Sequence, residues 1–350
     1  MKAVRLNIRN TSKEELEQFF LQYDIPKFKV SQVWDWLWKH HKLNFDGMTN
    51  LSLKERELLK EHFYIKQTQI LKESTSKDGT VKFLFQIEEG KVIEGVLIPQ
   101  RNRLTACISS QAGCSLACDF CATGKLKLFR NLTAGEIYDQ VFLINKFCLH
   151  QFNKPITNIV FMGMGEPLLN VKNVLKAIYY ITNKSGLNMS GKRITVSTVG
   201  ITKIIRYIAD RNPNFNLAIS LHAATDKKRS QIMDINNSNN LSNLKESLKY
   251  FYARTGIKPT FEYILLKGFN DHAQDANDLI DFCASIPSKV NLIEYNKVED
   301  TPYEKSTPKS TNLFINILEK KNVLVKLRKS RGEDIGEYRP SGALEIRQAG

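Results

Sequence analysis

The sequence predicts an α/β fold in which a mostly parallel sheet follows a helical N-terminal region. From Leu104 onward, short apolar segments alternate with amphipathic helical segments. This alternation implies parallel strands joined by right-handed crossover connections. Before Leu104, helical spacing comes first and short strands follow. The parallel strands are expected to centre near Ile108, Val160, Val196, Ile219, Ile264 and Leu292.

The N-terminal segment 1–66 is expected to form a helical accessory domain. Ser12 and Glu15, and again Ser52 and Glu55, have the spacing of a capping box, which starts a helix. Between these two starts, an apolar stripe contains tryptophans that could stack on nucleic-acid bases. Aromatic stripes at helical spacing more often pack in a core, and we prefer that interpretation.

Short strands are expected after the helices, with turns at Asp78-Gly79 and Glu89-Gly90. The barrel-like alternation then occupies most of the remaining chain, and no internal repeat or low-complexity linker interrupts it. We therefore divide the chain into an accessory domain at 1–66, a β extension at 67–103, a strand–helix domain at 104–300, and a C-terminal helix, strand and tail at 301–350.

The composition is that of a basic cytoplasmic protein. The 350 residues carry a net charge of +15, which favours polyanion partners such as RNA, although a general bias toward lysine would give the same value. The opening residues are too polar for a signal peptide, and no apolar run is long enough to span a membrane. We expect a monomer without a membrane partner, whose six cysteines stay reduced rather than forming disulfides.

Three cysteines are the most informative feature of the chain. Cys114, Cys118 and Cys121 have C-x3-C-x2-C spacing, which suits three corners of a [4Fe–4S] cluster and leaves one iron open for chemistry. A zinc site is the first alternative, with Cys107 as a fourth ligand, but zinc sites usually show a second short Cys or His pair. Buried free thiols are the second alternative.

The context of these cysteines resembles the RlmN/Cfr family of radical S-adenosylmethionine (SAM) RNA methyltransferases. The resemblance implies a partial (β/α)6 radical-SAM barrel, a [4Fe–4S] cluster and bound SAM. Active sites of related barrels lie at the carboxyl ends of the strands, where each matching motif falls. The motifs are C-I-S-S-Q-A-G-C-S-L-A-C-D-F-C-A-T-G from Cys107, R-N-L-T-A-G-E-I from Arg130, F-M-G-M-G-E-P-L at 161–168, V-S-T-V-G at 196–200, S-L-H-A-A at 220–224, N-L-I-E-Y-N at 291–296 and R-K-S-R-G-E-D-I at 328–335.

The resemblance also implies which residues hold SAM. Gly165 and Glu166 match residues at its amino end, which is reasonable because glycine permits close backbone approach and a carboxylate can bind an ammonium group. For His222, a satisfied core histidine is the simpler interpretation from the residue alone. The other positions that match the family's SAM site are Ser197, Ser220, Leu221, His222 and Asn296.

Two further residues match catalytic positions of the family. Cys107, expected at the start of the first parallel strand, matches a cysteine that acts late in the reaction as a base or resolving thiol. Glu94 matches a glutamate assigned as a proton acceptor. Carbon 2 of adenine is poorly nucleophilic, so a radical must be delivered, and the ring proton that leaves afterwards needs a base.

The C-terminal tail departs from the family pattern. Members carry a cysteine in a context like D-I-D-A-A-C-G-Q-L, which is methylated and then delivers the carbon. Here the residues after Ile335 contain no cysteine, and Ser341 would occupy the position only after three inserted residues. A serine is a much poorer nucleophile than a thiolate. A catalytically incomplete RNA-binding paralogue and a frameshifted copy therefore stay open as alternatives.

The implied reaction is methylation of adenine carbon 2 in 23S rRNA and in tRNA beside the anticodon, with a flavodoxin or ferredoxin as reductant. The branch of the family that methylates carbon 8 and confers antibiotic resistance is a further alternative. Candidate RNA contacts are Lys125, Lys127 and Arg130, and the strand-like segment around Lys326 and Arg328, whose cations alternate with apolar residues.

Overall fold

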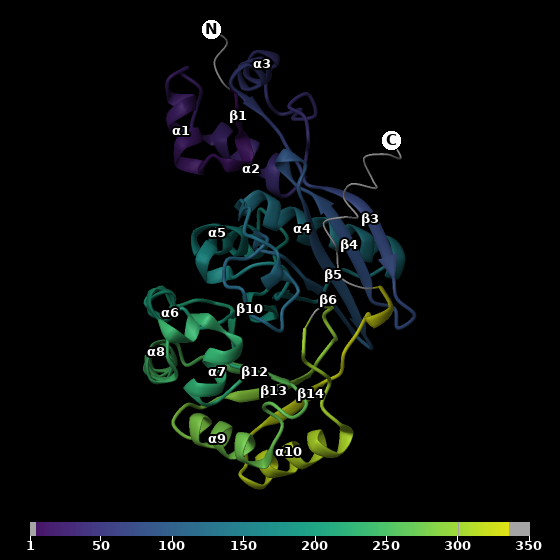
Figure 1. Ribbon diagram of the computed structural model, residues 1–350. Helices are drawn as coiled ribbons and strands as arrows, with labels where there is room; N and C mark the ends of the chain where they lie inside the picture. The colour runs from purple at the N-terminus through teal and green to yellow at the C-terminus, as the bar shows by residue number, and fades with distance from the viewer. Residues whose placement is uncertain (1–4, 300, 336–350) are drawn as a thin grey trace.

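The computed structural model describes residues 5–299 and 301–335, and a ten-stranded sheet runs through the described chain (Figure 1). Its spatial order is β14-β13-β12-β11-β10-β9-β6-β5-β4-β3. In chain order the strands are β3 (Gln69–Thr75), β4 (Val81–Gln86), β5 (Val92–Gln100), β6 (Arg103–Cys107), β9 (Asn158–Phe161), β10 (Ile194–Thr198), β11 (Asn216–Ser220), β12 (Thr260–Leu265), β13 (Lys289–Glu294) and β14 (Val325–Arg328).

The strands from β6 to β14 pair in parallel, which confirms the predicted α/β fold class. Strand β6 differs from the expectation, because it begins at Arg103 and ends at Cys107. An antiparallel hairpin with β5, in which Arg103 pairs with Gln100, sets this start. Cys107 therefore lies at the carboxyl end of the first parallel strand, and its predicted position at the start was wrong.

Helices follow the parallel strands and pack on one face of the sheet (Figure 1). Phe261 of β12 contacts Phe282, and Tyr263 of the same strand contacts Phe314, with ring centroids 5.3 and 5.5 Å apart. Alternate residues of each strand thus face the helices. The helices are α4 (Ala134–Phe152), α5 (Val171–Thr182), α6 (Thr202–Ala209), α7 (Asp226–Ile232), α8 (Leu241–Thr255), α9 (Ala273–Cys283) and α10 (Pro308–Lys320).

The N-terminal region forms α1 (Lys13–Leu21), α2 (Phe28–Trp38) and α3 (Leu53–His62), and β1 (Leu6–Asn7) pairs with β2 (Phe63–Tyr64). Both predicted capping boxes start helices, because Ser12 and Ser52 accept from backbone N–H groups three residues ahead. Trp34 and Trp38 are buried, with exposed fractions of 7% and 1%. The core interpretation of the tryptophan stripe is therefore confirmed for these two rings.

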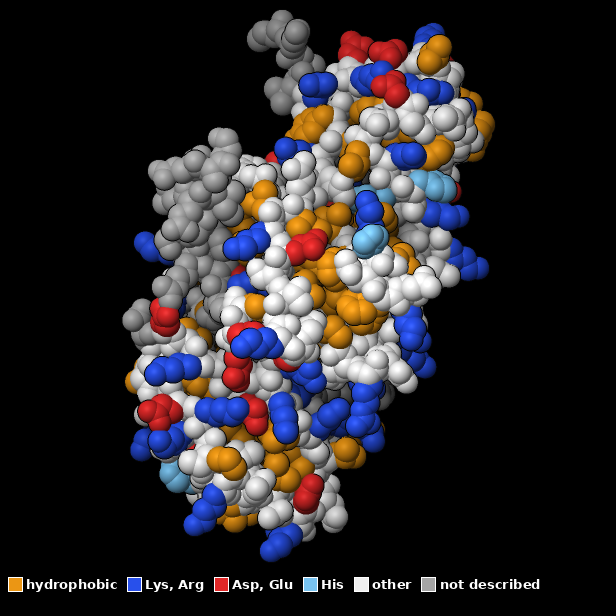
Figure 2. All heavy atoms as spheres, turned by 90° about the vertical axis from the view of Figure 1, so that its right-hand side faces the viewer, with side chains coloured by type: hydrophobic (Ala, Val, Ile, Leu, Met, Phe, Trp, Pro, Cys, Tyr) orange, Lys and Arg blue, Asp and Glu red, His pale blue; other side chains and the backbone are white. Residues whose placement is uncertain are grey.

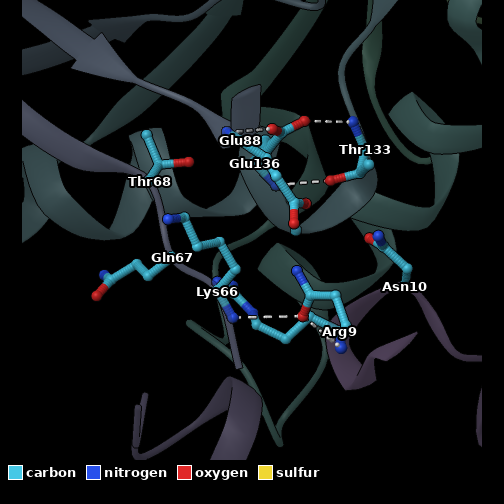
Figure 3. Close-up of a pocket in the computed structure, with 10 residues that line it drawn as sticks. Arg9, Asn10, Lys66, Gln67, Thr68, Glu88, Thr133 and Glu136 are labelled. Carbon is cyan, nitrogen blue, oxygen red and sulfur yellow. Dashed lines mark hydrogen bonds between the residues drawn. The ribbon is translucent and has the colours of Figure 1, made fainter. Parts of the chain in front are cut away.

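A buried ion pair joins the N-terminal region to α4. Arg9 donates to Asp139 at 2.7 Å, and its second guanidinium nitrogen lies 2.6 Å from the other carboxylate oxygen. His41 and the backbone N–H of Thr68 contact the same carboxylate. Figure 3 shows Arg9, Lys66 and Thr68 around a small cavity beside the start of α4. Asp139 of α4 thus bonds to three separate segments of the preceding chain, those of Arg9, His41 and Thr68.

In the part of the chain that the structure describes, every helix falls short of the length and apolar content needed to cross a bilayer.

Candidate active site

The face of the sheet opposite the helices lines the interior of the barrel and carries polar side chains. Side chains alternate between the two faces of a strand, so the residues between the helix-facing ones point inward. On β12, for example, Glu262 lies between Phe261 and Tyr263 and faces the interior. The same alternation places Glu94, Cys107, Ser197, Ser220, Glu262, Asn291 and Arg328 on the inner face.

The three motif cysteines lie in a tight loop between two short strands, β7 (Gln111–Ala112) and β8 (Arg130–Asn131), which pair with each other. The N–H of Cys114 donates to Leu126 across the loop, and that of Gly124 donates to Cys121. A side chain at Gly124 would place its Cβ 2.6 Å from the carbonyl oxygen of Cys118, so only glycine fits there. The loop therefore holds the three thiols close together.

The thiols sit in apolar surroundings that disfavour their charged forms. Cys118 packs against Val199 and Met233. Burial, followed by the nearby Cys121 and Cys114, raises the pKa of Cys118 to about 12. Burial, then Cys121, also raises the pKa of Cys114. Iron binds cysteines as thiolates, so the positive charge of a bound iron cluster would stabilise the thiolate forms that burial disfavours.

The loop fits an iron–sulfur cube better than a single metal ion. In a cube each cysteine binds a different iron, so the sulfurs need not meet at one point. Cys107, the fourth ligand of the zinc alternative, lies on β6 outside this loop. The donor set therefore favours the cluster over zinc.

Gly165 and Glu166 follow β9 and lie beside the cysteine loop. Gly165 has a φ of +92°, and a Cβ there would lie 2.4 Å from the side chain of Gln111. The Gln111 side chain accepts from the N–H of Glu166 at 2.8 Å and fixes this turn. The Glu166 carboxylate accepts from the N–H groups of Leu168 and Val199, both at 2.9 Å.

Burial raises the pKa of Glu166 to about 7, even though the two backbone donors act in the opposite direction. A buried carboxylate in this state gains most from a ligand that brings a positive charge or a strong donor. Val199 donates to the Glu166 carboxylate and packs in the same apolar cluster as Cys118, so the carboxylate lies beside the cysteine loop.

The predicted SAM positions on β10 and β11 come together. The hydroxyl oxygens of Ser197 and Ser220 are 3.4 Å apart on the inner face. Leu221 is fully buried, and its N–H and carbonyl bond to Glu262 and Arg229. Asn296 is exposed in the segment after β13. The structure thus brings the two serines together and leaves Asn296 on the surface.

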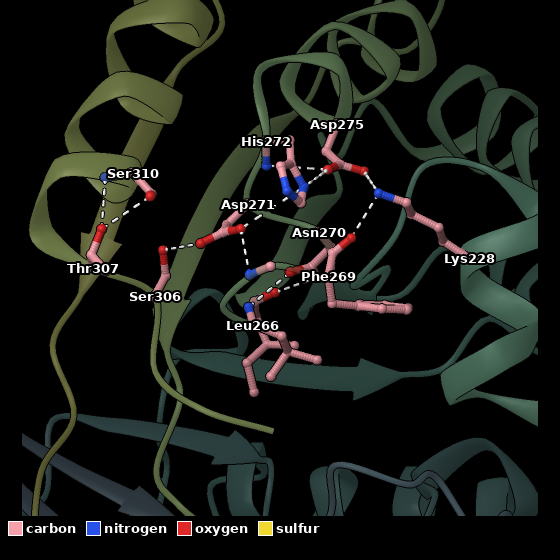
Figure 4. Close-up of polar contacts among 12 residues, drawn as sticks. Lys228, Leu266, Phe269, Asn270, Asp271, His272, Asp275, Ser306, Thr307 and Ser310 are labelled. Atoms are coloured by element: carbon pink, nitrogen blue, oxygen red, sulfur yellow. Dashed lines mark hydrogen bonds and ion pairs between the residues drawn. The ribbon is translucent and has the colours of Figure 1, made fainter. Parts of the chain in front are cut away.

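His222 is held as a structural residue. It has a φ of +59°, its Nδ1 accepts from the N–H of Ile264 at 3.1 Å, and its ring lies edge-on to Phe120 at 4.7 Å. Burial, then Arg229, lowers its pKa to about 3, so the ring is neutral. Its carbonyl accepts from Asn270, which belongs to the network of loop contacts after β12 (Figure 4).

Cys107 and Glu94 lie on neighbouring strands of the inner face. The carboxylate of Glu94 is 3.4 Å from the ammonium of Lys82, and its carbonyl accepts from Ser109. Burial raises the pKa of Cys107 to about 12, while a backbone hydrogen bond to Met162 acts to lower it. The two predicted catalytic residues therefore share the barrel interior.

The sequence analysis missed three buried polar residues, Gln111, Arg229 and Glu262, and expected Arg328 only as an RNA contact. Arg229 is fully buried and bonds to carbonyls of Val199, Ser220 and Leu221, so it ties together the ends of β10 and β11. The signal for Glu262 was present, because a lone carboxylate stands in the apolar run T-F-E-Y-I-L. Arg229 stands in the charged run D-K-K-R, so nothing in the sequence sets it apart as a buried residue.

Two family models match the chain. The model of the radical SAM superfamily covers residues 108–283, and that of the ribosomal RNA large subunit methyltransferase N-terminal domain covers residues 6–65. A probable dual-specificity RNA methyltransferase RlmN of Cytophaga hutchinsonii is 49% identical over 328 residues, with 94% of this chain and 90% of the relative covered. The chain belongs to the RlmN family of radical SAM enzymes.

Other RlmN relatives and a solved structure agree with this membership. The RlmN of Flavobacterium psychrophilum is 46% identical, with 96% of both chains covered. The crystal structure of a radical SAM methyltransferase from Sphaerobacter thermophilus matches with a TM-score of 0.87 and 33% identity, covering 94% of this chain and 97% of that one. The resemblance seen in the sequence is confirmed, and the chain is a radical SAM methyltransferase, a class that uses a [4Fe–4S] cluster and SAM.

Proposed function

We propose that this RlmN-family chain methylates carbon 2 of adenine in 23S rRNA and in tRNA beside the anticodon. The observation that carries the proposal is the placement of Cys114, Cys118 and Cys121 in one loop, beside the buried carboxylate of Glu166. The relatives, named dual-specificity RNA methyltransferases, and the match to an rRNA methyltransferase N-terminal domain support the RNA substrate.

The chain's own residues divide the work. Cys114, Cys118 and Cys121 would hold a [4Fe–4S] cluster, which when bound supplies an open iron and an electron for SAM. Glu166 orients the amino end of SAM, and we place Ser197 and Ser220 along the rest of that molecule. The roles of Leu221, His222 and Asn296 at SAM stay predictions of the sequence. Gly165, with a φ of +92°, forms the turn that positions Glu166.

Glu94 and Cys107 act in the later steps, Glu94 as a proton acceptor and Cys107 as a resolving thiol. Glu94 faces the interior from β5, which supports its role as acceptor of the proton that leaves the ring carbon. Cys107 lies at the end of β6 and faces the same interior, where it would serve as the resolving thiol. Cytoplasmic residence, a monomeric state and a flavodoxin or ferredoxin reductant remain predictions of the sequence.

RNA is expected to meet the protein through basic surface residues. Lys and Arg side chains predominate over acidic ones on the lower half of the face in Figure 2. Two of the expected contacts are already engaged within the protein: Arg130 bonds Glu136 and Glu89, and Lys125 donates to the carbonyl of Glu299. Lys127 and Lys326, both exposed, are the better candidates.

A second candidate function is an RNA-binding paralogue that starts the radical reaction without completing methylation. It is favoured by the sequence after Ile335, which contains no cysteine. Ser341, which would stand in its place, lies outside the described residues.

One experiment separates these functions. Reconstituted protein is incubated with SAM, a reductant and either a 23S rRNA fragment or tRNA, and 5′-deoxyadenosine and methyladenosines are measured by mass spectrometry. We expect 5′-deoxyadenosine but little methyladenosine from the chain as printed, and 2-methyladenosine once a D-A-A-C-G-Q-L-like tail follows Ile335. 8-Methyladenosine would assign the chain to the carbon 8 branch. Absence of 5′-deoxyadenosine from both chains would overturn the proposal.

A further inference from the structure

Arg328 reaches across the interior of the barrel. It is the last residue of β14, at the edge of the sheet, with a side chain that is 42% exposed. One guanidinium nitrogen lies 3.5 Å from Glu262 of β12, and another lies 3.9 Å from the sulfur of Met162, just after β9. Strands β14 and β9 are separated by four strands in the sheet order, so this contact spans the curled inner face.

Glu262 and Asn291 fix the position of this guanidinium. Glu262 is 2% exposed, and one of its oxygens accepts from Asn291 at 2.8 Å. Its other oxygen has no hydrogen-bond partner among the described residues. A carboxylate buried in this way needs a counter-charge, and Arg328 is the cation beside it. Removing Arg328 would therefore leave the buried Glu262 carboxylate without its counter-ion.

The guanidinium of Arg328 lies beside the strand that pairs with β6, because it contacts Met162, and Cys107 pairs with Val160, two residues before Met162. Met162 contacts both residues, through its sulfur to Arg328 and through its backbone to the Cys107 thiol. Burial most strongly disfavours the thiolate of Cys107; Arg328 from β14 favours it, and Glu94 from β5 opposes it. Two more charges act through these groups: Lys82 of β4 pairs with Glu94, and Glu262 of β12 pairs with Arg328.

We propose that Arg328 is a positioning residue for Cys107: its guanidinium, anchored by Glu262 and Asn291, directs a positive charge at the thiol and favours the thiolate. The inference rests on the proposed function only for the use of Cys107 in turnover. Thiolate, not thiol, is the nucleophilic form, so a buried cysteine that must react needs such a neighbour. Nothing in the motif comparison assigns this role to Arg328, which was expected on the RNA-facing surface.

The test measures the reactivity of Cys107 in reconstituted holoprotein without RNA. Iodoacetamide, which is uncharged, is reacted for timed intervals between pH 7 and pH 10, and alkylation of the Cys107 peptide is quantified by mass spectrometry. Below the thiol pKa the rate follows the thiolate fraction, so Arg328→Gln should lower it about threefold or more at pH 8. The factor should stay nearly constant from pH 7 to pH 10, because this range lies below the thiol pKa of about 12. Arg328→Lys should recover part of the rate.

A matched control is Lys326→Gln, which removes a cation two residues earlier on the same strand and should leave the profile unchanged. An unchanged Cys107 profile in Arg328→Gln would overturn the inference. An equal loss in Arg328→Gln and Arg328→Lys would also overturn it, because that pattern reports altered access rather than lost charge. Neither outcome bears on whether the protein cleaves SAM or methylates RNA, so the proposed function is tested separately.

Discussion

Asparagine in place of Asp139 removes the negative charge at the centre of the contact between the N-terminal region and α4. The change keeps the shape of the side chain and leaves Arg9, 2% exposed, without its counter-ion. It also leaves one oxygen to accept from three donors, which come from Arg9, His41 and the N–H of Thr68. An unpaired buried cation is the dominant penalty.

The magnitude follows from the burial of this pair. Breaking a buried, hydrogen-bonded ion pair by removing one partner costs about 3–5 kcal/mol. Unfolding entropies of about 2.1 cal/mol/K per residue give about 0.7 kcal/mol/K for 350 residues. Asp139→Asn should therefore lower the melting temperature by about 4–7 °C. Adding Arg9→Met should recover much of the loss, because the orphaned charge is then gone.

The effect should depend on pH in one direction. Burial alone would raise the pKa of Asp139, but Arg9 and His41 outweigh it and hold the pKa below the ordinary value of 3.8. A group with a lowered folded pKa contributes stability above its unfolded pKa and loses it as the pH falls through the folded value. The difference between parent and Asp139→Asn should stay constant from pH 5 to 8 and shrink below about pH 4.

Differential scanning fluorimetry or calorimetry measures these shifts. Glu304→Gln, which breaks the exposed pair with Lys267, is the control and should leave the melting temperature unchanged. A melting temperature of Asp139→Asn within 1 °C of the parent, or a double variant less stable than Asp139→Asn, would refute the reasoning.

The remaining predictions concern the cluster, the cofactor turn and RNA. Cys118→Ala should abolish the iron–sulfur absorbance of anaerobically reconstituted protein, whereas Cys148→Ala should keep it; stoichiometric zinc without iron in protein purified without air would contradict the cluster. Gly165→Ala should weaken SAM binding at least tenfold in equilibrium dialysis, because its Cβ meets Gln111 at 2.4 Å and its φ is +92°; unchanged affinity would separate that turn from the cofactor. Affinity for an rRNA fragment should fall steeply with salt, and Lys326→Glu should reduce the log–log slope by about 0.7–0.9, the value for one phosphate contact; binding that ignores salt would count against a basic RNA surface.

Local patterns predicted the order of elements and the cysteine loop. The capping boxes at Ser12 and Ser52 and the strand–helix alternation depend on neighbours within one helix or strand, so the sequence displays them directly. The loop of Cys114, Cys118 and Cys121 is local for the same reason. The start of β6 was misplaced because a hairpin to β5, rather than the apolar run around Ile108, determines it.

Long-range pairings could not be predicted. Arg9 and Asp139 are 130 residues apart, and neither stands in a pattern that points to the other. Arg328 alternates with apolar residues as expected, but the side of β14 that faces solvent depends on how α10 packs. Val325 and Leu327 pack against the helix-side core, which turns Arg328 to the barrel interior.

The strands expected as a β extension continue the sheet of the barrel. Strand β5 pairs with β6 through five residue pairs, and β6 pairs in turn with β9, so the antiparallel strands continue the sheet of the barrel. Val96 lies opposite Cys107 in this register, and Glu94, two residues before Val96, faces the same side. A sheet that ended at β6 would keep the cysteine loop and lose Glu94. The continuous sheet therefore explains how residues from the extension, from the first parallel strand and from β14 meet in one interior.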